Sequence, residues 1–173
     1  MQKDIFNFEL LDKYPPNIVI GESLKQIEEA TRGYVIGHIA QYDGAVTLST
    51  ISSRLSELTL GEKSADIQNE LGEQKKEQNK FEVFLTVKGL EYYKYRIMFV
   101  EYGMISYPVS IVMEEELAVE YCGKRKTGFV INSMNELKNM LDSVINSDRM
   151  ILLIQNLINE SLRQENKELT QIE

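Results

Sequence analysis

Residues that build disulfides, zinc sites and acid–base centres are scarce in this sequence. Its 173 residues include one cysteine, one histidine and no tryptophan. A single cysteine excludes an intramolecular disulfide framework, and one cysteine with one histidine excludes the zinc-finger patterns. A general base needs a nucleophile and an orienting acid beside it, and no motif supplies these to the histidine, His38. We therefore expect no metal, no cofactor and no catalytic residue.

Basic residues are outnumbered by acidic ones. Lys and Arg total 19 and Asp and Glu total 27, which gives a net charge of −8. Such a charge repels nucleic acids and anionic membranes. Residues 1–11 lack the basic start and the apolar core of a signal peptide, and the apolar run at 150–154 is too short to span a bilayer. We expect a cytoplasmic protein that binds neither nucleic acids in general nor membranes.

Apolar and polar residues alternate most clearly in the middle of the chain, which predicts β-strands. The pattern runs from Phe81 to Lys88 and from Tyr93 to Phe99, and a third segment extends from Ile105 to Met113. Together they predict an antiparallel meander. Pro108 lacks an amide donor, so the third strand is expected at a sheet edge or a bulge. Further strands are expected at 34–41, 46–51, 117–122 and 128–131.

Helix signals flank this strand-rich region. Ser23 to Gln26 has the form of a capping box and Gly33 suits a left-handed helix end, so a helix is expected at 24–31. Ser133 and Ser147 each precede an apolar stripe at helical spacing, which predicts two C-terminal helices.

These elements predict an α+β fold. We expect a mostly antiparallel sheet of five to seven strands, with a short N-terminal helix and two C-terminal helices packed on one face. The length is typical of one domain, which would cover residues 1–173. Residues 61–80 contain little apolar surface and are expected to form a mobile polar segment. From residue 164 the chain is polar, and its end is expected to fray.

Tyrosine is unevenly distributed along the chain. Six of its nine tyrosines lie between positions 92 and 121. Tyrosine offers a large contact area with a polar tip and suits an interface, although it also fits a half-exposed strand. Tyr92, Lys94 and Arg96 recur at every second position, so in a strand they share one side. We expect these three residues to bind a partner, or a second copy of the chain, through a face outside the core.

A second candidate site is the dense basic cluster Lys124-Arg125-Lys126, which lies between two glycines. The cluster lacks the spacing of a phosphate-binding loop, but amides in a tight glycine-bounded turn can bind an anion. The alternative is a solvated hairpin tip that discourages edge pairing. Cys122 just before it is expected to be a small, buried or half-buried residue at a strand end, and the acidic run 114–116 is expected to form a charged loop.

Two classes of function remain open. The first is a small acidic, non-enzymatic interaction protein, similar in role to an immunity protein, an inhibitor or a chaperone. The second is a small-ligand or anion-binding domain, possibly enzymatic, with a cleft near His38 or the turn from Lys124 to Lys126. A deep pocket at those residues would favour the second class, and an exposed tyrosine-lined surface would favour the first.

Overall fold

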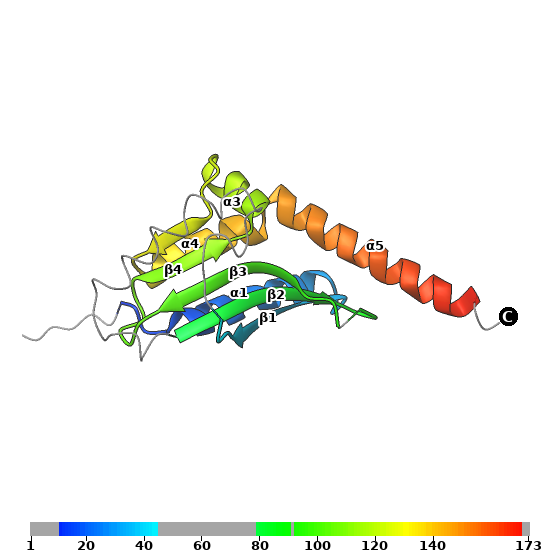
Figure 1. The fold of residues 1–173 in the computed structure, drawn as a ribbon, viewed down its shortest axis with the longest axis horizontal. Helices are drawn as coiled ribbons and strands as arrows, with labels where there is room; N and C mark the ends of the chain where they lie inside the picture. Colours follow the sequence, from blue (N-terminus) through cyan, green and yellow to red (C-terminus); the bar gives the residue numbers. More distant parts are fainter. Residues whose placement is uncertain (1–10, 45–78, 91, 171–173) are drawn as a thin grey trace, which may run out of the picture.

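A five-stranded antiparallel sheet with helices against it forms the body of the protein (Figure 1). The computed structural model describes residues 11–44, 79–90 and 92–170. The elements in chain order are α1 (Pro16–Ala30), β1 (Val35–Gln41), β2 (Asn79–Val87), β3 (Tyr95–Tyr102), β4 (Val109–Met113), α3 (Glu115–Cys122), β5 (Gly128–Ile131), α4 (Met134–Ile145) and α5 (Asp148–Thr170). The predicted α+β class and the predicted range of strand number are confirmed.

The sheet has the simplest possible order, β1-β2-β3-β4-β5, and every neighbouring pair is antiparallel. This confirms the predicted meander of β2, β3 and β4. Along β2, Val83, Leu85 and Val87 belong to the main hydrophobic core, which they share with buried residues of α1 and α4. The residues between them, among them Glu82 and Phe84, therefore lie on the opposite face of the sheet.

Helix α1 begins earlier than the predicted helix at 24–31. It starts at Pro16, because proline fits the first helical position, where an amide donor is not needed. The Ser23 hydroxyl lies inside the helix and donates to the Val19 carbonyl at 3.1 Å, so it does not cap. The predicted left-handed residue after the helix is confirmed at Gly33, with φ 78°.

Residues 117–122 form helix α3, and the predicted strand there is wrong. The Glu114 carboxylate accepts a hydrogen bond from the Leu117 amide at 3.0 Å and so caps the helix start. Gly123 ends the helix in the left-handed conformation. Leu117 and Ala118 are adjacent and both buried, which a helix allows and an alternating strand does not. The acidic run 114–116 is therefore a helix start and not a charged loop.

The third meander strand is neither at a sheet edge nor bulged at Pro108, so both predicted alternatives are wrong. Strand β4 begins at Val109, directly after Pro108, so the proline lies outside the hydrogen-bonded ladder. This leaves β4 free to pair with both β3 and β5. Within the described residues, the edges of the sheet are β1 and β5.

Both predicted C-terminal helices are present. The Ser133 hydroxyl accepts from the Glu136 amide at 3.2 Å at the start of α4, and the Ser147 hydroxyl accepts from the Met150 amide at 3.1 Å at the start of α5. Helix α5 extends past the end of the sheet at which β2 and β3 are joined (Figure 1). It continues to Thr170, and fraying beyond residue 164 stays a prediction.

Two predicted segments fall largely outside the described residues. The strand expected at 46–51 lies there entirely. Of the polar segment expected at 61–80, residues 79 and 80 are described, and they belong to β2.

Tyr107 supplies a test of the packing between the N-terminal segment and the sheet. Burial, and secondarily the Asp12 carboxylate, raises the pKa of Tyr107 to about 12. The ordinary tyrosine pKa is about 10, so the unfolded chain ionises first and stability should fall as the pH rises from about 10 to about 12. We expect Tyr107→Phe to reduce the late tyrosinate absorbance at 295 nm without abolishing it, because burial also raises the pKa of Tyr95 and of Tyr102. Tyr92→Phe should leave the late absorbance unchanged. An undiminished late component in Tyr107→Phe would contradict this assignment.

Candidate binding surface around the β2–β3 turn

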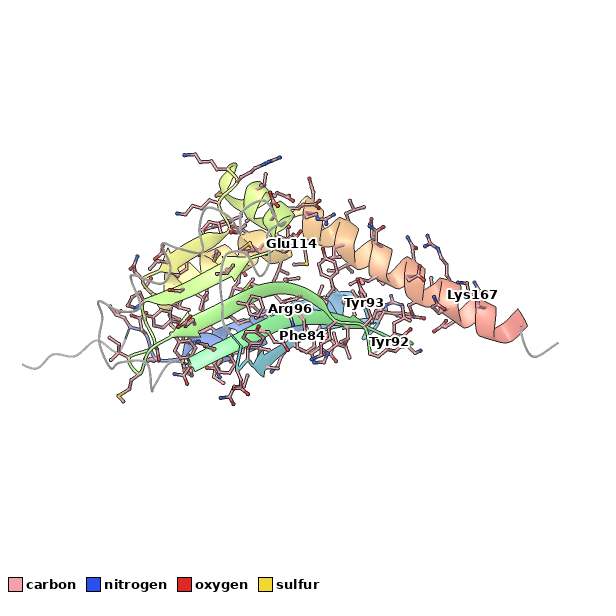
Figure 2. All side chains as sticks on the ribbon, in the orientation of Figure 1. Phe84, Tyr92, Tyr93, Arg96, Glu114 and Lys167 are labelled. Atoms are coloured by element: carbon pink, nitrogen blue, oxygen red, sulfur yellow. The ribbon has the colours of Figure 1, made fainter. Side chains whose placement is uncertain are left out.

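Two exposed tyrosines lie at the turn between β2 and β3 (Figure 2). Tyr92 is 84% exposed and Tyr93 is 50% exposed. The turn is closed by hydrogen bonds from the Leu90 amide to the Val87 carbonyl and from the Tyr93 amide to the Leu90 carbonyl, at 3.0 and 2.9 Å. Backbone hydrogen bonds therefore link Tyr93 to Leu90 and Leu90 to the end of β2.

The predicted side-by-side arrangement of Tyr92, Lys94 and Arg96 on one strand is wrong. Strand β3 begins at Tyr95, so Tyr92 and Lys94 belong to the turn and lack the period of a strand. Tyr92 faces α5, whereas Lys94 and Arg96 both contact Glu82 on the far face of the sheet. The three residues therefore flank one turn on two different sides.

Glu82 is the centre of a small charged cluster on the face opposite α1 and α4. Its side chain is 10% exposed. Arg96 donates to one of its oxygens through Nε at 2.9 Å and through Nη2 at 2.6 Å, and Lys94 Nζ lies 3.5 Å from the other oxygen. Lys94 and Arg96 are 53% and 42% exposed. Both cations therefore pair with a nearly buried carboxylate, while about half of each side chain remains exposed to solvent.

The same two cations lie over aromatic rings, two of which are buried. Lys94 Nζ is 4.4 Å from the centroid of Phe84, and the Arg96 guanidinium is 5.0 Å from that of Phe99 and 5.9 Å from that of Tyr42. Phe84 and Phe99 are 6% and 0% exposed. Cation–ring contacts stabilise such an arrangement. Arg96 therefore supports the sheet from this face, a role that the sequence did not indicate.

His38 belongs to the same face and makes structural contacts. Its ring stacks on Phe84 with centroids 5.0 Å apart, and its Nε2 lies 2.7 Å from the Thr86 hydroxyl. His38 is therefore a hydrogen-bonded histidine within strand β1.

A cleft of about 520 Å³ separates the β2–β3 turn from α5. The turn and the start of β3 contribute Leu90, Tyr92, Tyr93 and Tyr95, and α5 contributes Arg149, Leu153, Asn156, Leu157, Glu160 and Gln164. The volume lies within the range of sites that bind small molecules or short segments. Neither His38 nor the turn 124–126 lines this cleft.

Helix α5 is fastened to the turn by Ser161. This serine is fully buried, and its hydroxyl donates to the Lys88 carbonyl at 2.5 Å. Gly89 follows with a positive φ of 81°, and a Cβ built on it would lie 3.9 Å from the Ser161 oxygen. This contact keeps the two walls of the cleft at a fixed separation.

Arg149 lies at one end of the cleft. Its Nη2 pairs with the carboxylate of Glu116 in α3, and its Nε is buried without a hydrogen-bond acceptor among the described residues. Tyr95 lies beside it. Burial, then the nearby Glu114 carboxylate, raises the pKa of Tyr95, while the Arg149 guanidinium acts in the opposite direction.

The basic cluster 124–126 joins α3 to β5 and is not the tip of a hairpin. The Cys122 thiol, at the end of a helix and not of a strand, donates to the Lys124 carbonyl at 3.2 Å. Arg125 lies 4.0 Å from Glu115, and Lys126 lies over the Phe129 ring at 5.6 Å. Anion binding by these residues stays a prediction.

The sequence predicts Tyr92 as a site residue, but it does not predict that residues of α5 line the same cleft. Arg149, Leu153, Asn156, Leu157 and Glu160 recur at helical spacing, so the sequence contains the signal for a shared helix face. It contains no local signal that this face meets the β2–β3 turn.

Within the described part of the chain, no group of three or more His, Cys, Asp or Glu residues could hold a metal ion. None of the helices described is both long and apolar enough to cross a membrane. The chain also matches no known family model, and no curated protein or solved structure matches it.

Proposed function

We propose that this protein is a cytoplasmic, non-enzymatic interaction module that binds a protein partner through the β2–β3 turn. Its role would be that of an immunity protein, an inhibitor or a chaperone. The observation that carries the proposal is Tyr92, which is 84% exposed at the rim of a cleft of about 520 Å³. Exposed tyrosines beside a pocket are among the features that most often carry interface energy.

The other turn residues fit this role in different ways. Tyr93 lines the same cleft and is half-exposed, so a partner that covers Tyr92 also reaches Tyr93. Lys94 remains half-exposed on the other side of the turn and can add a polar contact at the rim. Arg96 acts mainly by holding Glu82, and so positions the base of the turn.

Site-specific crosslinking in the source cell tests this proposal. A photoreactive benzoylphenylalanine would replace Tyr92, and in a matched control it would replace Ile105, which is 81% exposed in the turn at the other end of β3. We expect one discrete adduct from position 92 and none from position 105. Equal adducts from both positions, or none from position 92, would contradict the proposal.

A further inference from the structure

The cleft between the turn and α5 has an apolar floor. Leu90, Leu153 and Leu157 line it and are 8%, 5% and 8% exposed, whereas Tyr92 and Tyr93 stand much more exposed at its rim. An apolar side chain placed on these leucines would remove the rest of their surface and its own from water. The floor therefore favours an aliphatic or aromatic anchor.

The Arg149 end of the cleft offers hydrogen-bond donors without a net positive charge. Guanidinium has five N–H donors. Arg149 lines the cleft with a side chain that is 25% exposed, and it also bonds to Glu116 and Tyr95. Its charge is balanced by Glu116, and Glu114 is close enough to act on the neighbouring Tyr95. A carboxylate or phosphate would be repelled by these two glutamates, so a neutral carbonyl oxygen is the better acceptor here.

The negative charge at the opposite end of the cleft, on Glu160, is also balanced by neighbouring groups. The carboxylate of Glu160 accepts from Gln164 at 2.8 Å and from Arg163 at 3.0 Å, and these bonds lower its pKa. Between the two ends lies the exposed amide of Asn156. A side-chain amide both donates and accepts, which matches the N–H and C=O groups of a peptide backbone.

We propose that this cleft binds a short, uncharged peptide segment of the partner, in extended form, with an aliphatic or aromatic residue seated on the three leucines. The proposal rests on the function proposed above and adds the chemistry of the partner. Its length follows from α5, which rises about 22 Å from Arg149 to Gln164 at about 1.5 Å per residue. An extended chain covers that distance with about seven residues.

Selection of peptides by the full chain tests this chemistry. Phage displaying random peptides about seven residues long would be selected on the immobilised protein, and a labelled synthetic copy of the enriched peptide would then be titrated. We expect one shared apolar position and no shared charge. Asn156→Asp should weaken binding about tenfold, because it removes a donor and adds a charge. Asn159→Asp makes the same change on the same helix outside the cleft and should leave the affinity unchanged.

The outcomes separate this inference from the proposed function. Equal affinity for the Asn156→Asp and Asn159→Asp variants, a shared Lys, Arg, Asp or Glu in the enriched peptides, or no enrichment would overturn the inference. If the adduct at position 92 still forms in any of these cases, the proposed function stands, and only the claim that the cleft binds an uncharged peptide segment is rejected. If that adduct is absent while peptides bind in the cleft, the peptide chemistry stands and the assigned partner surface is rejected.

Discussion

The Arg96→Met variant should be less stable than the wild-type protein by about 2–3 kcal/mol. The cause is Glu82, whose side chain is 10% exposed and receives two hydrogen bonds from Arg96. Among the described residues, Lys94, at 3.5 Å, is then the remaining cation paired with this nearly buried carboxylate. The variant also loses the cation over the Phe99 ring. Urea-induced unfolding followed by circular dichroism measures the difference.

Neutralising the carboxylate supplies the matched control. Glu82→Gln removes the carboxylate that pairs with Arg96, but the Arg96 side chain is 42% exposed and water can solvate it, so the loss should be about 1 kcal/mol. The Glu82→Gln/Arg96→Met double variant should be more stable than Arg96→Met alone, because the unpaired charge is gone. If Arg96→Met lowers the free energy of unfolding no more than Lys94→Met does, then Arg96 does not stabilise the fold through the buried carboxylate of Glu82. Tyr92 and Lys94 are therefore the better positions for testing partner binding.

The strands of the meander were predictable because their signal is local. In β2 and β3 alternate residues face a helix-covered core, and that alternation appears directly in the sequence. The strand predicted from Leu117 to Cys122 is wrong because a short apolar run fits either a strand or a helical turn. The cap from Glu114 favours the helix, but in the sequence it lies in a run of three glutamates that is equally typical of a charged loop.

The candidate site was only half predictable for a different reason. The exposure of Tyr92 follows from its place in a turn, and composition alone singled out the tyrosines. The opposite wall depends on Ser161 meeting the Lys88 carbonyl, across 73 positions of the chain. Such a contact arises from the packing of the whole fold and leaves no pattern in either segment.

The Ser161→Leu variant should lose about 2–4 kcal/mol of stability and most of its affinity for the partner peptide. Ser161 is fully buried against the β2–β3 turn, so a leucine must displace either α5 or the turn. The Lys88 carbonyl also loses its donor. Chemical denaturation measures the stability, and titration with the selected peptide measures the affinity.

Two matched variants isolate the contribution of this contact to the cleft. Ser161→Ala removes the hydroxyl but fits the space, so we expect a loss of about 1 kcal/mol and little change in peptide affinity. Asn159→Leu adds an apolar side chain at an exposed position of the same helix and should change stability by less than about 0.5 kcal/mol.

Hydrogen exchange locates the effect within the molecule. In Ser161→Leu the amides of Leu90 and Tyr93, which close the turn, should exchange faster than in the wild type, while those of β4 should be affected less. Uniform acceleration would mean that the whole fold has loosened and that the weaker binding says nothing about the cleft. Acceleration confined to the turn, together with weakened peptide binding, would mean that α5 supports the partner site by holding its wall beside Tyr92.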